Sequence, residues 1–169
     1  MVRAIILCAT FLAPHAIAEN RHAGAHVHGV NHVKLVLSDS SLQISYEFPV
    51  VQLAKHDEHK HDELAEQLEE IKSITTLVAI PDAADCSQSD IRQELGAVAS
   101  TGSDEAHADH QDVIIEAVLT CQNPSALNTM DFSPAFNHFD DVEKIEVEGI
   151  LGAQPISETL MARKAVISF

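Results

Sequence analysis

The sequence predicts an α+β fold with a mostly antiparallel sheet, amphipathic helices and one disulfide. Residues 32–37 and 42–48 alternate apolar and polar side chains with the period of a β-strand, and a turn-forming SDSS segment joins them as a hairpin. Between 60 and 72 the apolar spacing becomes that of an amphipathic helix. Strands and helices do not alternate regularly as βαβ units, which favours antiparallel pairing. Each half of the chain holds a strand pair and a helix, so the layout is compatible with two similar halves.

The first half of the chain supplies the clearest periodicity. The residues expected to face the core in the hairpin are Val33, Leu35, Leu37, Leu42, Ile44, Tyr46 and Phe48. In the helix, Leu64, Leu68 and Ile71 share one face, and either Asp57 or Asp62 could cap its N-terminus. The ITTLVAIP segment, 74–81, fits a continued helix and a strand equally well.

The second half adds further strands and one short helix. Residues 99–111 combine small, acidic and histidine residues and are expected to form an exposed loop. Residues 112–121 are apolar enough for a central strand, 133–143 predict a short capped helix, and 144–151 alternate again. The last segment, 158–169, should close the sheet as one more strand.

Residues 1–18 have the pattern of a secretory signal peptide. Arg3 precedes an apolar run, and an AIA sequence follows at 16–18, where we expect cleavage after Ala18. The apolar run is too short for a spanning helix, and Leu7 before Cys8 argues against lipoprotein processing. The mature chain, 19–169, is therefore expected to be one exported α+β domain that does not insert into the membrane.

The charge of the mature chain excludes nucleic acid as a partner. The full sequence has 26 acidic and 10 basic residues. Removing Arg3 with the signal peptide leaves 9 bases, and 9 − 26 gives a formal charge of −17. A nucleic-acid-binding protein needs a basic surface instead.

Two cysteines remain after cleavage, Cys86 and Cys121. An exported chain meets an oxidising compartment, where an even pair usually forms a disulfide. The alternative is a Cys/His metal site, but neither cysteine has a histidine within ten residues of it, and there is no CxxC pair.

Histidines gather in three polar segments and point to metal chemistry. The candidate ligands are His26, His28 and His32, then His56, His59 and His61, and finally His107 and His110. Imidazole is a common ligand for zinc and also suits copper and nickel. One histidine pair alone would more often be a surface accident, whereas three such segments in one acidic exported chain favour a metal site.

The spacing of these histidines allows each segment to supply at least a pair of ligands. His26 and His28 would lie about 6.6 Å apart on one face of an extended chain, and His32 shares their parity about 13 Å beyond His28. His56 and His59 share a helical face, while His59 and His61 share an extended one. Neighbouring acids such as Asp57 and Asp62 could ligate directly or orient a ring.

The sequence lacks the motifs of calcium sites and of common catalytic sites. There is no EF-hand loop for calcium, no HExxH motif for catalytic zinc and no GxSxG nucleophile elbow. An H-x-H with a disulfide is similar to copper/zinc superoxide dismutase, but the glycine-rich segments and later histidine motif are missing. We therefore expect no enzyme activity.

The order of motifs resembles the ZrgA-like family of zinc-regulated periplasmic proteins. AHVHGVNHVKLVL is followed by LQISYEFPVVQLAKHDEH, LVAIPDAADC, VLTCQNPSALNTMDF and FDDVEKIEVEGIL. The resemblance covers about 26–169 and implies periplasmic zinc binding in aid of acquisition, alongside a zinc ABC importer and its solute-binding protein. His26 and His28 match the family's H-x-H-G, and Cys86 with Cys121 match its cysteine pair. His107 and His110 stand where relatives have a longer histidine run, so capacity here would depend on the 55–61 segment instead.

Two functions remain open from the sequence. The first is a zinc carrier or buffer that feeds the importer. The second is a non-metal periplasmic interaction protein whose histidines respond to pH.

Overall fold

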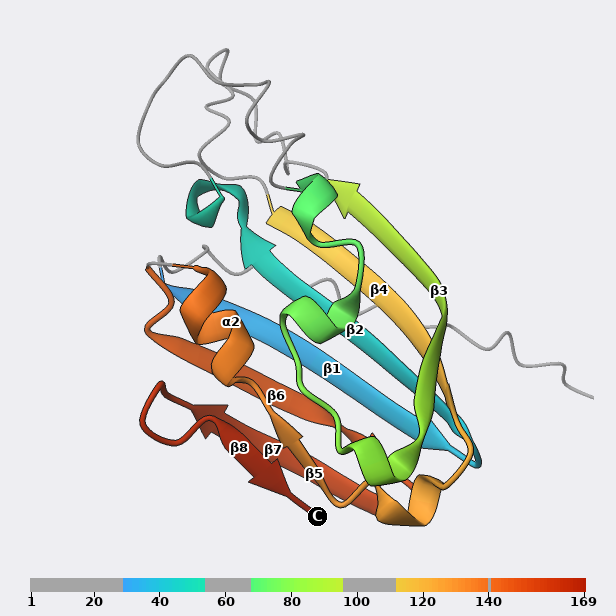
Figure 1. The fold of residues 1–169 in the computed structure, drawn as a ribbon. Helices are drawn as coiled ribbons and strands as arrows, with labels where there is room; N and C mark the ends of the chain where they lie inside the picture. Colours follow the sequence, from blue (N-terminus) through green and yellow to red (C-terminus); the bar gives the residue numbers. More distant parts are fainter. Residues whose placement is uncertain (1–28, 54–67, 96–111, 140) are drawn as a thin grey trace, which may run out of the picture.

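The chain folds mainly into β-structure. This computed structural model describes residues 29–53, 68–95, 112–139 and 141–169 (Figure 1). Strands account for 56% of these residues and helical turns for 19%. The predicted α+β class with amphipathic helices is therefore wrong.

A six-stranded mixed sheet forms the body of the molecule. Its strand order is β3-β4-β2-β1-β6-β7. The strands are β1 (Val30–Ser38), β2 (Ser41–Pro49), β3 (Cys86–Leu95), β4 (Asp112–Cys121), β6 (Lys144–Leu151) and β7 (Gln154–Leu160). The β1–β6 pair is parallel and the other neighbours are antiparallel. A small second sheet pairs β5 (Thr129–Asp131) with β8 (Val166–Ser168).

One face of the sheet is covered, and the core lies beneath that cover. Figure 1 shows α2 (Ser133–His138), η2 (Ile74–Thr76) and the β5–β8 pair in front of the sheet. The remaining short turns are η1 (Val50–Gln52), η3 (Asp82–Ala84) and η5 (Pro124–Ala126). Aromatic rings connect the layers, since the Phe48 and Phe139 centroids are 4.7 Å apart. The His138 ring packs edge-on against Phe139, with the ring centroids 4.8 Å apart.

The hairpin prediction is confirmed together with its core-facing residues. Strands β1 and β2 pair from His32↔Glu47 to Ser38↔Ser41, and the alternating residues from Leu42 to Phe48 are at most 1% exposed. The strands at 112–121 and 144–151 and the short helix after residue 132 are also present. The 74–81 segment is neither a continued helix nor a strand: it forms η2 and one isolated bridge, Ala79↔Asp131.

Three features depart from the sequence prediction. Of the helix expected over 60–72, the described part is helical only at 68–70. The two-halves layout is wrong, because β2 pairs with β4 and β1 with β6, so both parts of the chain contribute to one continuous sheet. The last segment is two strands rather than one, because Met161 and Lys164 exchange backbone hydrogen bonds in a turn between β7 and β8.

Candidate functional site

Most of the predicted histidine ligands lie outside the described residues. His26, His28, His56, His59, His61, His107 and His110 all fall in the ranges 1–28, 54–67 and 96–111, as does the exposed loop predicted for 99–111. Their role as metal ligands therefore stays a prediction. His32 is the predicted metal ligand that the structure places.

The described residues that flank the three histidine segments lie at the same end of the sheet. Pro49 at the end of β2 pairs with Asp112 at the start of β4, and Leu95 at the end of β3 pairs with Val113. On the other side of β2, His32 near the start of β1 pairs with Glu47. We call the end formed by Val30, Pro49, Leu95 and Asp112 the loop end (Figure 1).

The return from the second segment is also held at the loop end. The Gln93 side chain on β3 donates through Nε2 to the backbone oxygens of Leu68 at 3.0 Å and Ile71 at 2.8 Å. Gln88 adds bonds to the backbone of Lys72 and Ile74. These amides fix where the chain re-enters the fold after residue 67.

The entry into β1 is fixed by a glycine that closes the H-x-H-G motif. Gly29 has φ +80°, and a Cβ there would lie 2.8 Å from Cγ of Glu143 and 3.0 Å from the carbonyl oxygen of Asp141. Its carbonyl accepts hydrogen bonds from the backbone N–H groups of Glu143, at 2.8 Å, and Lys144, at 3.1 Å. The chain just after His28 is thereby held against the start of β6.

His32 lies on the face of the sheet opposite α2 and the β5–β8 pair, which we call the open face. It belongs to a mostly polar row of paired residues that crosses the sheet at the loop end. Its ring is 51% exposed, and Nδ1 lies 3.5 Å from Oε2 of Glu146 on β6. The other carboxylate oxygen of Glu146 is 2.5 Å from Nζ of Lys144. The paired positions across the row are Glu94, Ile114, Glu47, His32, Glu146 and Thr159.

The electrostatics of this row keep Glu146 ionised. The hydrogen bond from Lys144 is the main cause that holds the Glu146 pKa below its ordinary value, and the charges of Lys144 and His32 act in the same direction against partial desolvation. Glu146 and Lys144 were not selected from the sequence. The alternation in 144–151 indicated that they face outward, but the parallel pairing that brings them beside His32 joins distant segments.

In the protein interior near the loop end, two polar side chains are fully buried. Asn31 Nδ2 donates to the hydroxyl of Tyr46 at 3.0 Å, and both residues are 0% exposed. Burial raises the Tyr46 pKa well above its usual value despite the opposing hydrogen bond. Asp112 at the start of β4 is also buried, 8% exposed. Buried polar groups of this kind fix the strand register because they tolerate few alternative partners.

The described residues alone do not form a complete metal site. Within 29–53, 68–95, 112–139 and 141–169, no group of three or more His, Cys, Asp or Glu side chains is arranged to hold an ion. A tetrahedral zinc site closed by protein ligands would need more groups than His32 and Glu146. The described part of the chain also has no helix long and apolar enough to cross a membrane.

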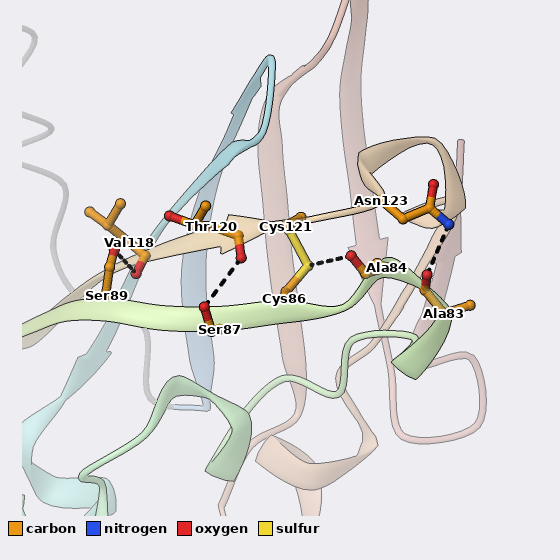
Figure 2. Close-up of a disulfide and its surroundings, with 9 residues drawn as sticks. All are labelled: Ala83, Ala84, Cys86, Ser87, Ser89, Val118, Thr120, Cys121 and Asn123. Carbon is orange, nitrogen blue, oxygen red and sulfur yellow. Dashed lines mark hydrogen bonds between the residues drawn. A yellow bond between two sulfur atoms is a disulfide. The ribbon is translucent and has the colours of Figure 1, made fainter.

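The predicted disulfide is confirmed. Cys86 and Cys121 face each other across the β3–β4 pair with an S–S distance of 2.06 Å (Figure 2). They lie at the end of these strands opposite the loop end. Two serine hydroxyls on β3 donate hydrogen bonds to backbone carbonyl oxygens on β4: Ser87 to that of Thr120 and Ser89 to that of Val118. The Cys/His metal alternative is thereby excluded for these two cysteines, because their sulfurs are bonded to each other.

Comparison with known proteins gives the family. No curated protein matches the sequence. The family model described as "ZrgA family zinc uptake protein" matches residues 25–169, which includes the H-x-H-G motif, both cysteines and every described strand. The chain therefore belongs to the ZrgA family of zinc uptake proteins.

Proposed function

We propose that this protein is a periplasmic zinc carrier or buffer that assists zinc acquisition by feeding a zinc ABC importer. Family membership supports a role in zinc uptake. The observation that carries the finer proposal is the common position of the flanking residues: the described residues that follow the first histidine segment, and those on both sides of the second and third, lie at the loop end. His32 is exposed at the same end.

This arrangement supports a site assembled from more than one segment. Each segment supplies two or three imidazoles, and a closed tetrahedral zinc site needs additional ligands. Segments tethered at one end of a rigid sheet meet at a smaller entropic cost than segments tethered far apart. We therefore expect His56, His59 and His61 to ligate zinc together with His26 and His28 or with His107 and His110.

Zinc is the proposed cargo because of the family, although the ligand chemistry alone is less selective. Neutral imidazoles bind copper and nickel at least as readily. Binding should weaken as the pH falls through the histidine range, since protonated imidazole cannot ligate. Residues 1–18 are proposed as a cleaved signal peptide, and a zinc solute-binding protein is the proposed recipient of the ion. No chemical reaction is assigned to the protein.

Calorimetric titration of the tag-free mature protein with zinc tests this proposal. At about pH 7.4 the imidazoles are mainly neutral, so saturable binding is expected. Replacing His56, His59 and His61 by alanine should weaken it about tenfold or more, an effect comparable to loss of a metal-site group. His138→Ala is the matched control, because that ring packs against Phe139 and lies outside the three segments.

Zinc titration of the protein without substitutions distinguishes the zinc carrier from the pH-responsive interaction protein. Absence of saturable zinc binding would contradict the carrier proposal. Association with another protein that changes with pH but ignores a chelator would support the pH-responsive alternative instead.

A further inference from the structure

The open face of the sheet carries a histidine and a carboxylate whose separation suits a metal ion better than a hydrogen bond. His32 Nδ1 and Glu146 Oε2 are 3.5 Å apart. An N–H···O hydrogen bond is usually about 2.7–3.2 Å long. Zinc bonds of about 2.0–2.2 Å to nitrogen and oxygen at the tetrahedral angle place the two ligand atoms about 3.4 Å apart. The observed pair therefore has the length of one edge of a zinc tetrahedron.

Strand pairing holds this edge in place. His32 and Glu146 are directly opposite each other in the parallel β1–β6 pair. The adjacent inward residues Val33 and Val147, which are 1% and 0% exposed, anchor the two backbones in the core. The two side chains are 51% and 38% exposed, so an ion could reach them from solvent without a change in the fold.

Lys144 binds the second oxygen of the Glu146 carboxylate. Its Nζ is 2.5 Å from Glu146 Oε1, which leaves Oε2 directed toward the histidine. An ammonium at this position neutralises part of the charge that would attract a metal ion and repels the ion itself. Glu47, opposite His32 on β2, restores negative charge on the other side.

We propose that His32 and Glu146 form a zinc entry site on the open face at the loop end, with Lys144 as a built-in competing cation that keeps the bound ion exchangeable. Two protein ligands leave the remaining coordination positions to water, so the ion is held more weakly than in a closed site. This proposal rests on the proposed zinc function for the identity of the ion. It adds a ligand, Glu146, and a residue that sets affinity, Lys144.

The test follows the His32 ring itself. The ¹⁵N-labelled mature protein is titrated with zinc sulfate while long-range ¹H–¹⁵N spectra record each imidazole, and His32→Gln assigns the ring. Three variants are compared with the parent: Glu146→Gln, Lys144→Gln and the matched control Glu148→Gln. The control removes the same charge from the same strand and face, opposite Lys34 rather than a histidine.

The expected results separate ligation from general electrostatics. Glu146→Gln should raise the zinc concentration that half-saturates the His32 signal by about tenfold or more, as loss of a metal-site group does. Lys144→Gln should lower it about two- to fivefold, the range of an exposed ion pair, and Glu148→Gln should change it by less than about twofold.

Each contrary result has its own meaning. Equal effects of Glu146→Gln and Glu148→Gln would overturn the site, because only the surface charge would then matter. No saturable response of His32 in the parent, with responses at other histidines, would overturn this inference and leave the proposed function standing. No response at any histidine would overturn both. If Lys144→Gln left the half-saturating zinc concentration unchanged, the proposed role of Lys144 as a competing cation would be overturned.

Discussion

At the scale of single residues, Tyr46 makes the fold sensitive to alkaline pH. Its phenol is fully buried, and its pKa is raised by desolvation above the ordinary value of about 10. In the unfolded chain the phenol would ionise at that ordinary value. The folded state therefore holds its proton to higher pH, so the stability that this group provides is complete below about pH 10 and is lost as the pH rises beyond it.

This sequence makes the effect easy to observe. Tyr46 is the single tyrosine, and the chain has no tryptophan, so tyrosinate absorbance reports one group. We expect the folded protein to titrate well above the midpoint measured in denaturant. The Tyr46→Phe variant should lose less stability between neutral and alkaline pH than the parent, while at neutral pH it should be about 1–2 kcal/mol less stable because Asn31 loses its partner. A folded-state midpoint near that of the denatured chain would contradict the burial argument.

At the scale of elements, the parallel pairing of β1 with β6 depends on Gly149. A Cβ at this position would lie 2.1 Å from the carbonyl oxygen of Leu35, inside any allowed contact. Gly149→Ala should therefore force the two strands apart and lower the free energy of unfolding by at least about 2 kcal/mol, as overpacking in a tight interface does. Denaturant unfolding measures the change.

A second glycine in the same region provides the control. Gly152 has φ +64°, but a Cβ there would meet nothing within 4 Å. Gly152→Ala should cost only the left-handed backbone penalty of about 1 kcal/mol. If the two substitutions proved equally costly, close approach of β6 to β1 would not be the reason for glycine at 149.

Periodicity predicted the elements that bury one face and missed those that do not. The β1–β2 hairpin, β4 and β6 alternate against the core, so the sequence shows them. Strand β3 lies at the edge of the sheet, and Ile91 is its main core contact in a polar CSQSDIRQEL sequence. Such a strand is held by pairing, by Gln88 and Gln93, and by its disulfide, none of which leaves a hydrophobic period.

The residues of the candidate site also divide into those that the sequence predicted and those that only the structure revealed. Histidine spacing identified the possible ligands along the chain, including His32. Glu146 and Lys144 could not be assigned to it, because residues more than a hundred positions away along the chain become neighbours only through the parallel pairing. Local sequence carries no signal for a long-range register of this kind.

At the scale of the whole molecule, the sheet separates a covalently fixed end from the loop end. Strand β4 runs from Asp112 to Cys121, and a strand of this length spans about 30 Å. The disulfide therefore lies far from His32 and from the flanks of the histidine segments. The disulfide and the proposed zinc ligands therefore lie at opposite ends of the sheet.

This separation predicts that the disulfide can be removed with little effect on zinc affinity. Its cysteines are 35 residues apart in sequence, and the loop entropy that the bridge removes from the unfolded chain corresponds to about 3–4 kcal/mol. Replacing both Cys86 and Cys121 by alanine should lower the free energy of unfolding by about that amount, measured with denaturant. Calorimetry below the unfolding transition should show zinc affinity within about threefold of the parent, because contacts at distant, independent sites act nearly additively. A tenfold loss of affinity in a variant that remains folded would instead mean that β3 transmits the constraint along its length, through the glutamines that hold residues 68–74, to the histidine segments at the loop end.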